Sequence, residues 1–404
     1  MKAVGLIVEY NPFHHGHAYH VNKAKEITGA EIAIAAMSGN FLQRGEPALI
    51  SKWTRTEMAL RGGIDLVFEL PYTFAVQKAD TFANGALSLL SAAECDYICF
   101  GSESGNIEAF YQTYNFLKNN KHKYNESVQT FIKLGNSYPK AMSLAYQELG
   151  PASNLLDLSK PNNILGFQYV RAAIEKQLPI KMTTITRKDA GYHDEFFASP
   201  SIASATSIRK ALFTLPEDLS AVQPYIPNQT YDLLLQYREQ FGAFHSWDMY
   251  WDYLQFILLR TNANQLKAIY EIEEGMENRI LSNIKTSQSF THLMGALKTK
   301  RYTWTRLQRV LTHILTGTTK DEMKMLKERV TYLRLLGMTE KGRLYLNRLK
   351  KTCPLTIVTK RASFNSPQID IDSRAAELYT IGLPTNSRQF ALQQEYYQKP
   401  IYLK

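Results

Sequence analysis

Two histidines near the start of the chain, His14 and His17, have the spacing and the surroundings of a phosphate-binding site. They follow an apolar run at residues 4–8 that predicts a buried parallel strand, and Pro12 predicts a turn before a helix. Residues three apart at the beginning of a helix share one face, close to unpaired backbone N–H groups and to the positive end of the helix dipole. Gly16 allows a ligand to approach the backbone closely. This arrangement favours a nucleotide as the ligand.

Two other interpretations of the histidine pair stay open from the residues alone. The rings could form a hydrogen-bonded pair inside the core, or they could be two ligands of a metal ion. The metal interpretation is the weaker one, because no cysteine or carboxylate completes a ligand set nearby and Glu9 lies on the strand side of the turn. We therefore predict no protein-bound metal here, and the strand–turn–helix context favours phosphate binding.

The composition is typical of a globular protein that is long enough for two or three domains. The chain has 404 residues, of which 45% are hydrophobic and 21% are charged. No apolar run reaches the ~20 residues that a membrane-spanning helix needs, and no leader-type segment opens the chain. Three cysteines are too few and odd in number for a disulfide framework. We expect a cytoplasmic protein without membrane contacts.

Positive charge is concentrated in one part of the sequence. The whole chain has a formal net charge of +10, but residues 281–360 contain 17 Lys and Arg against 4 Asp and Glu and so carry +13. A local excess of this kind indicates a polyanionic partner such as RNA. The alternative is a solvated face of one or more helices.

The pattern of apolar residues divides the chain into two parts. The first ~210 residues alternate short apolar runs with helical patterns, which predicts βαβ units and ligands at the carboxyl ends of parallel strands. From about residue 215 the apolar positions repeat at helical intervals, with one extended run within residues 351–360. We therefore predict an α/β fold, with a Rossmann-like parallel-sheet domain at residues 1–215 and a mainly α-helical domain at residues 216–404. The predicted strands are 3–8, 31–37, 65–70, 97–100 and 180–186, and the predicted helices between them are 17–27, 52–61, 82–93 and 164–176.

A second candidate site element, residues 204–209, follows the last predicted strand. Ser204 and Thr206 are good N-cap residues for a helix that begins here, and this structural role is sufficient to explain them. Arg209, in the first turns of that helix, would face a triphosphate, where a guanidinium can stabilise charge on a leaving pyrophosphate. We therefore place these three residues beside the two histidines as candidate catalytic residues.

Both elements resemble those of one superfamily. The motif His14-x-Gly16-His17 resembles the signature of the HIGH-motif nucleotidyltransferases, which activate a substrate by attack on the α-phosphate of ATP or CTP. Residues 204–209 resemble the I-S-S-T-x-I-R element that closes the nucleotide pocket in that superfamily, with Ala205 in place of a second Ser. This departure puts one hydroxyl contact in doubt.

Three longer stretches resemble the tRNA-Met cytidine acetate ligase family, and the resemblance extends over the full chain. They are residues 5–17 (GLIVEYNPFHHGH), 37–47 (MSGNFLQRGEP) and 160–163 (KPNN). The resemblance implies an ATP-binding, catalytic nucleotidyltransferase domain at 1–215 and a basic tRNA-binding domain at 216–404. It implies a bacterial ligase that uses ATP, with Mg²⁺, to convert acetate into acetyl-adenylate. The enzyme would then acetylate N4 of the wobble cytidine in the anticodon loop of elongator tRNA-Met, forming N4-acetylcytidine.

The resemblance also implies which residues contact ATP. They are Ile7, Val8, Glu9, Tyr10, Asn11, Pro12, Phe13, His14, His15, Gly16, His17, Ala18, Tyr19, His20, Gly101, Asn162, Arg187 and Lys188.

The basic region contains two candidate RNA surfaces. The first interleaves cations with aromatic residues, which suits phosphate contacts beside base stacking, although Trp304 would also suit the core. It consists of Lys298, Lys300, Arg301, Tyr302, Trp304, Arg306 and Arg309. The second consists of Lys341, Arg343, Arg348, Lys350 and Lys351.

Two other functions remain as alternatives. A small-molecule nucleotidyltransferase that makes NAD or dephospho-CoA would share the histidine motif, but it would leave the +13 segment and the long helical part unexplained. A non-catalytic RNA-binding protein would not need His14, His17, Thr206 and Arg209. The residues determine neither the acyl pocket, nor the base that accepts the N4 proton, nor the oligomeric state.

Overall fold

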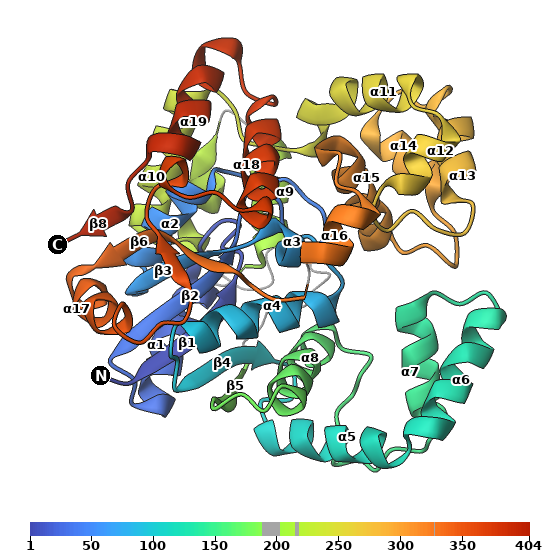
Figure 1. Ribbon diagram of the computed structural model, residues 1–404, viewed down its shortest axis with the longest axis horizontal. Helices are drawn as coiled ribbons and strands as arrows, with labels where there is room; N and C mark the ends of the chain where they lie inside the picture. Colours follow the sequence, from blue (N-terminus) through green and yellow to red (C-terminus); the bar gives the residue numbers. More distant parts are fainter. Residues whose placement is uncertain (188–202, 215–217, 327) are drawn as a thin grey trace.

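The computed structural model describes residues 1–187, 203–214, 218–326 and 328–404 (Figure 1). Its strands form one mixed sheet in the order β5-β4-β1-β2-β3-β6-β7, with β8 paired to β6. The first five strands are parallel, and β6 runs antiparallel to β3. The predicted Rossmann-like parallel sheet is confirmed. The strands are β1 (Ala3–Val8), β2 (Ile32–Ser38), β3 (Leu66–Leu70), β4 (Tyr97–Ser102), β5 (Lys181–Thr186), β6 (Tyr332–Thr339), β7 (Thr356–Val358) and β8 (Ile401–Leu403).

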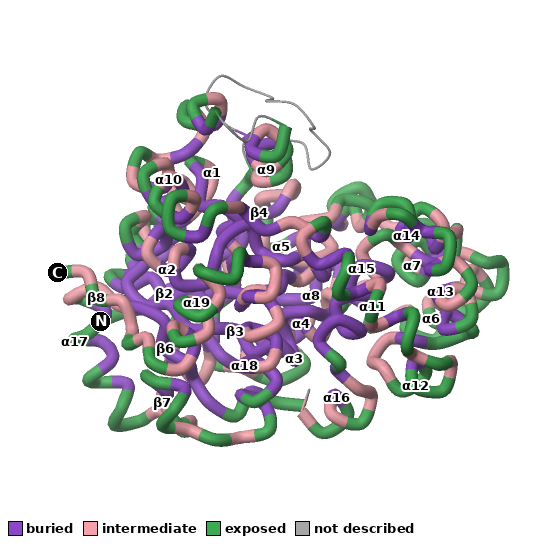
Figure 2. The backbone as a smooth tube through the Cα atoms, turned by 90° about the horizontal axis from the view of Figure 1, so that it is seen from above, coloured by how far each residue is buried: buried purple, intermediate pink, exposed green. Residues whose placement is uncertain are grey.

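Helices cover both faces of this sheet, which is why its central strands consist of continuous apolar runs. In β2, Ile32, Ile34 and Ala36 enter the core on one face, and the alternate residues enter the core on the other. Figure 2 shows these strands as buried between the two layers. One face is covered by α4 (Ala79–Ala92) and α8 (Pro161–Glu175), and the other by α1 (His15–Thr28), α2 (Lys52–Arg61) and α10 (Asn228–Phe241).

The C-terminal part of the chain is mainly helical, but it returns to the sheet. β6 lies beside β3, and α17 (Glu340–Leu349) packs on the same face as α4. Strands on both sides of the boundary predicted at residue 215 therefore belong to the same sheet. β6 was not predicted, because Arg334 interrupts its apolar run. In the fold Arg334 is buried, and its charge is balanced by Glu69 and Glu395.

Five helices of the C-terminal part form a lobe at the right of Figure 1, and their core also includes Phe41, Tyr72 and Tyr379 from outside the lobe. They are α11 (Trp251–Arg260), α12 (Ala263–Ala268), α13 (Met276–Ile284), α14 (Phe290–Leu297) and α15 (Trp304–Thr316). The other short or C-terminal elements are α3 (Tyr72–Ala75), α9 (Ala205–Thr214), η1 (Leu219–Tyr225), η2 (Trp247–Tyr250), α16 (Lys320–Leu326), η3 (Arg361–Ser363), α18 (Pro367–Thr380) and α19 (Thr385–Tyr397).

Three further helices lie between β4 and α8, where the sequence analysis predicted no element. They are α5 (Ile107–Asn119), α6 (Lys121–Lys133) and α7 (Tyr138–Glu148), and they extend away from the sheet at the lower right of Figure 1. Across the described ranges, no helix combines the length and the apolar character that crossing a bilayer requires.

Candidate active site

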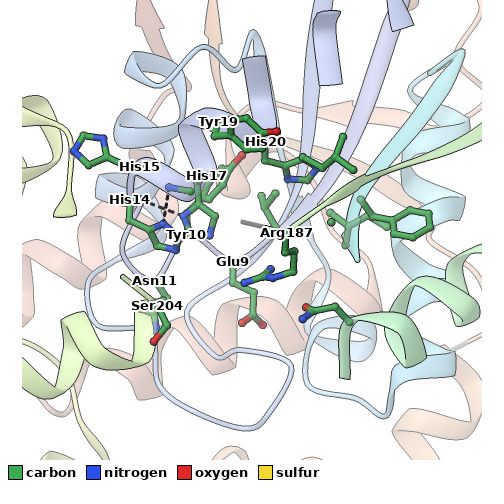
Figure 3. A pocket seen from close by; sticks show the side chains of 18 of the residues that line it. Glu9, Tyr10, Asn11, His14, His15, His17, Tyr19, His20, Arg187 and Ser204 are labelled. Atoms are coloured by element: carbon green, nitrogen blue, oxygen red, sulfur yellow. Dashed lines mark hydrogen bonds between the residues drawn. The ribbon is translucent and has the colours of Figure 1, made fainter. Parts of the chain in front are cut away.

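A cavity of about 570 Å³ lies at the carboxyl ends of β1, β4 and β5, where a parallel α/β sheet binds its ligands (Figure 3). Most of the predicted ATP contacts line it, namely Ile7, Val8, Glu9, Tyr10, Asn11, His14, His15, Gly16, His17, Tyr19, His20, Gly101, Asn162 and Arg187. The predicted catalytic residues Ser204 and Arg209 line it as well. Residues that were not predicted complete the wall, namely Phe100, Leu165, Tyr169, Ile185, Thr186, Ala203 and Ala205.

Four predicted site residues do not line the cavity, and a fifth is not described. Pro12 and Phe13 are buried in the β1–α1 turn, where the Phe13 ring meets the edge of Tyr10 at 4.8 Å between centroids. Ala18 packs against the core below α1. Thr206 is exposed in the first turn of α9, and Lys188 lies outside the described residues.

His14 and His17 cap the helix that they begin. Nδ1 of His14 accepts the backbone N–H of Gly16 at 3.1 Å, and Nδ1 of His17 accepts the backbone N–H of His14 at 3.2 Å. Their rings stack with centroids 3.7 Å apart (Figure 3). Because Nδ1 is an acceptor in each ring, a neutral imidazole carries its proton on Nε2. The pair is thus a structural cap that also presents two Nε2–H donors.

Burial keeps these histidines neutral. Desolvation, reinforced by the positive charge of Arg187, lowers the pKa of His14 to about 3 and that of His17 well below its usual value. Desolvation also lowers the pKa of His20, which hydrogen-bonds the Cys99 carbonyl, to about 4. At pH 7 the histidines therefore act as neutral hydrogen-bond donors and not as cations.

Two arginines supply the positive charge of the cavity. Arg209 donates from Nη1 to the Asn11 carbonyl at 3.0 Å and pairs through Nη2 with Glu46 at 3.1 Å. Arg187 extends from the end of β5, and a Cβ on Gly101 would stand 3.1 Å from its Cγ. The absence of a side chain at Gly101 therefore leaves room for the Arg187 side chain. These two guanidiniums can bind phosphate oxygens.

Two unusual polar groups complete the wall of the cavity. Asn11 accepts the Leu49 N–H at 2.7 Å, but its Nδ2 is buried without a hydrogen-bond partner among the described residues. Glu9 is the one carboxylate among the described residues that line the cavity, and its Oε1 accepts the Gln43 N–H at 2.8 Å. Burial raises the pKa of Glu9. Asn11 thus lines the cavity, but its Nδ2 is itself buried.

Arg55 was not among the predicted site residues, but it holds together main-chain segments next to the cavity. This buried residue of α2 donates to the main-chain carbonyls of Glu9 and Ser38 at 2.7 and 3.0 Å, and also to those of Gly39 and Ile50. It therefore joins the ends of β1 and β2 under the cavity. Arg55 lies between Thr54 and Thr56 in a mostly polar predicted helix, so the sequence carried no signal of its burial.

Several residues of the first candidate RNA surface are buried or form ion pairs within the protein. Arg309 is buried and pairs with Glu271 at 3.0 Å. Arg301 pairs with Glu274 at 2.8 Å, and Arg306 lies 3.6 Å from Glu273. Tyr302 is buried, and Trp304 is 40% exposed. Lys298 donates a hydrogen bond to the Tyr302 carbonyl, and Lys300 is exposed to solvent. Much of the charge expected to meet RNA is therefore balanced within the protein.

The second candidate RNA surface lies on α17 at the opposite end of the sheet from the cavity. Gly342 packs against the carbonyl of Asp65, just before β3, and Arg348 donates to the Met1 carbonyl, just before β1. Arg343 pairs with Glu340 at 2.7 Å. These contacts place the surface at the amino ends of the strands.

Comparisons with known proteins agree with this geometry. Residues 1–395 match the model of the HIGH Nucleotidyl Transferase family. The tRNA(Met) cytidine acetate ligase of Geobacillus sp. (strain WCH70) is 48% identical over 402 residues, which are 99% of this chain and 100% of that protein. The protein of the same name from Bacillus subtilis (strain 168) is 47% identical over 405 residues, covering 99% and 97% of the two chains.

Two solved structures share the fold over their whole length. The crystal structure of Thermotoga maritima TmcAL in its apo form I matches with a TM-score of 0.90 at 31% sequence identity, covering 100% of both chains. The structure of that protein bound with alpha-thio ATP gives the same values. The chain therefore belongs to the HIGH nucleotidyl transferase family and shares it with the tRNA(Met) cytidine acetate ligases.

Proposed function

We propose that this chain is a tRNA(Met) cytidine acetate ligase. It activates acetate with ATP as acetyl-adenylate and transfers the acetyl group to N4 of the wobble cytidine of elongator tRNA-Met in the bacterial cytoplasm. The observation that carries the proposal is the stacked, neutral His14–His17 pair, which presents two donors to the cavity. This pair occurs in a chain that is 48% identical over its length to a ligase of that name.

The first step joins acetate to the α-phosphate of ATP. A carboxylate oxygen attacks the α-phosphorus, and the bond from that phosphorus to the bridging oxygen breaks, so that pyrophosphate leaves with the bonding electrons. Acetate is already anionic at pH 7, so the protein needs no base for this step. Its task is to hold the reactants and to stabilise charge on the phosphate oxygens. We assign this task to Nε2–H of His14 and His17 and to the guanidiniums of Arg187 and Arg209.

Mg²⁺ enters with ATP as part of the substrate. The ion takes oxygen ligands and retains several waters, and it is commonly held by phosphates with only one or two carboxylates. Glu9 is the single carboxylate among the described lining residues. Most ligands of the ion would therefore come from the triphosphate and water.

The second step requires the cytidine to leave its base stack. Its N4 attacks the acyl carbon and loses one proton to water, the bond from that carbon to the phosphate oxygen breaks, and AMP leaves with the bonding electrons. A base held in a stack cannot reach the acyl carbon, so the anticodon loop must extend the nucleotide into the cavity. Every described residue that lines the cavity precedes residue 210, which supports our assignment of ATP binding and catalysis to residues 1–215.

ATP–pyrophosphate exchange tests the first half-reaction without tRNA. Labelled pyrophosphate should enter ATP only when acetate is present. Exchange that instead requires nicotinamide mononucleotide or phosphopantetheine would indicate a dinucleotide-forming transferase. If no acid supports exchange, the adenylate mechanism is contradicted and the non-catalytic RNA-binding alternative gains support.

A further inference from the structure

The helices α5–α7 form an insertion that begins and ends at the rim of the cavity. Gly101, at the end of β4, and Asn162, at the start of α8, both line the cavity, and the insertion lies between them. The two ends are tied together by Glu103, which accepts the Asn162 side chain and the Asn163 N–H, each at 2.7 Å. The insertion is therefore anchored where the nucleotide is proposed to bind.

The outer two helices form a hairpin that is nearly independent of the sheet. α6 and α7 pack on each other around Val128, Ala141 and Ala145, and α5 connects them to the rest of the molecule. Figure 1 shows the pair standing apart from the sheet, beyond α5. So small a core leaves most of the hairpin surface in contact with solvent.

The hairpin surface carries positive charge that the protein does not balance. Residues 118–150, which are the hairpin together with the end of α5, contain five lysines and two glutamates, and all five lysines are exposed. Glu126 lies 3.2 Å from His122, and none of the five lysines forms an ion pair within the described part of the chain. In residues 301–309, by contrast, the arginines form ion pairs with glutamates. The lysines are Lys118, Lys121, Lys123, Lys133 and Lys140.

The tip of the hairpin adds apolar and aromatic surface to this charge. Leu134 is 71% exposed and Tyr138 is 57% exposed, and Lys133 and Lys140 flank them in the chain. Lysines bind phosphates, and an exposed tyrosine can stack on an unpaired base. The combination is suited to RNA.

We propose that the α6–α7 hairpin is an RNA-binding arm that contacts tRNA outside the nucleotide held in the cavity. This inference rests on the proposed function, because that function supplies the RNA. The 13 residues of α5, at about 1.5 Å each, carry the hairpin about 20 Å from the rim.

Neutralising the lysines tests the arm against a matched control. The arm variant is Lys123→Gln/Lys133→Gln/Lys140→Gln. The control variant, Lys2→Gln/Lys181→Gln/Lys404→Gln, removes three exposed lysines that belong to neither candidate RNA surface and lie just before β1, at the start of β5 and just after β8. For each variant, the tRNA dissociation constant is measured at several KCl concentrations, and acetate-dependent ATP–pyrophosphate exchange is measured without tRNA.

The arm variant should bind tRNA at least tenfold more weakly at 0.1 M KCl, and the slope of log Kd against log salt should fall by about 2. Exchange should match the wild type, and the control variant should keep the wild-type slope. Tyr138→Ala should weaken binding about tenfold and leave the salt slope unchanged.

Equal affinities and slopes for the arm and control variants would overturn the proposal, as would weaker binding by the arm variant with an unchanged slope. A loss of exchange in the arm variant would show a general structural defect. In that case the Tyr138→Ala variant tests the proposal alone. Wild-type tRNA affinity in Tyr138→Ala would then reject the RNA-binding arm. If the wild type neither exchanges pyrophosphate nor acetylates tRNA, the proposed function fails instead.

Discussion

At the scale of single residues, the site depends on side chains that do two things at once. His14 and His17 close the first turn of α1 through Nδ1, and that use of Nδ1 leaves Nε2–H for the ligand. Arg209 holds the β1–α1 turn through the Asn11 carbonyl while it lines the cavity. Substitutions that preserve one role and remove the other can therefore separate structure from catalysis.

Substitution of His17 by Asn should remove catalysis and retain the fold. The Asn oxygen can accept the His14 N–H in place of Nδ1, but the shorter side chain presents no donor where Nε2 lay. We expect acetate-dependent exchange to fall about 10²- to 10³-fold, as for the loss of one donor to a developing anion. The melting temperature should change little. The matched control is His292→Asn, an exposed histidine whose Nδ1 also accepts a backbone N–H, and its exchange rate should equal the wild type.

Substitution of Arg209 by Lys should weaken the use of ATP. A lysine cannot contact both the Asn11 carbonyl and Glu46, as the guanidinium does, and it cannot bind phosphate in a bidentate manner. We expect kcat/KM for ATP in the exchange reaction to fall about 10- to 100-fold. Unchanged kinetics would show that Arg209 serves only to hold the turn.

At the scale of elements, α2 connects the carboxyl ends of β1 and β2 through hydrogen bonds from one of its side chains. Arg55 links four main-chain carbonyls there, and Glu9, one of the residues so held, lines the cavity. The loop that follows β2 is attached in turn to α15, because the Gly45 carbonyl accepts the Thr312 hydroxyl at 2.7 Å. The shape of the cavity therefore depends on packing between segments far apart in the sequence.

Arg55→Met should destabilise the protein strongly, because it leaves the buried carbonyls without donors. We expect the free energy of unfolding to fall by about 3–5 kcal/mol, measured by urea denaturation. Arg61→Met on the same helix removes an exposed arginine that pairs with Glu57, and it should cost less than about 0.5 kcal/mol. Equal losses for the two variants would contradict the role given to Arg55.

Local patterns were enough to predict the first five strands and the histidine motif. β1 has the predicted bounds, and α1 begins two residues before the predicted helix. The missing elements depend on distant partners, because the apolar run of β6 contains Arg334, whose charge is balanced by Glu69 and Glu395. α6 was missed for a different reason, since Val128 is its one buried residue.

Charge counted along the sequence was a poor guide to charge on the surface. The +13 segment begins at residue 281, but three of its arginines, Arg301, Arg306 and Arg309, pair with glutamates at positions 274, 273 and 271, just outside the segment. The five lysines of residues 118–140 belong to no such run, but the structure leaves them exposed and without ion pairs in its described part.

At the scale of the whole molecule, several histidines are buried in the neutral form. Burial lowers the pKa of His245 and of His313 to about 3, as it does for His14. The unfolded chain binds protons at these residues near pH 6.5, but the folded chain does not. Their contribution to stability is therefore fully present above about pH 6.5 and is lost as the pH falls toward 3.

His245→Gln should make the stability less dependent on pH. His245 lies between the hydroxyls of Tyr237 and Tyr250, at 2.9 and 2.6 Å, and it lies outside the cavity. Between pH 6 and 4, the free energy of unfolding of the wild type should fall more steeply than that of the variant, by up to about 1.4 kcal/mol per pH unit. Parallel curves would show that His245 does not resist protonation in the fold.

The complete reaction is tested by incubating the protein with ATP, Mg²⁺, labelled acetate and total bacterial tRNA and analysing the nucleosides by mass spectrometry. We expect labelled N4-acetylcytidine that forms only when ATP is present and that forms at least about 10²-fold more slowly with His17→Asn. Release of pyrophosphate without this nucleoside would retain the α-phosphate chemistry but contradict the assigned acceptor. Formation of N4-acetylcytidine at the wild-type rate by His17→Asn would contradict the role given to the histidine pair.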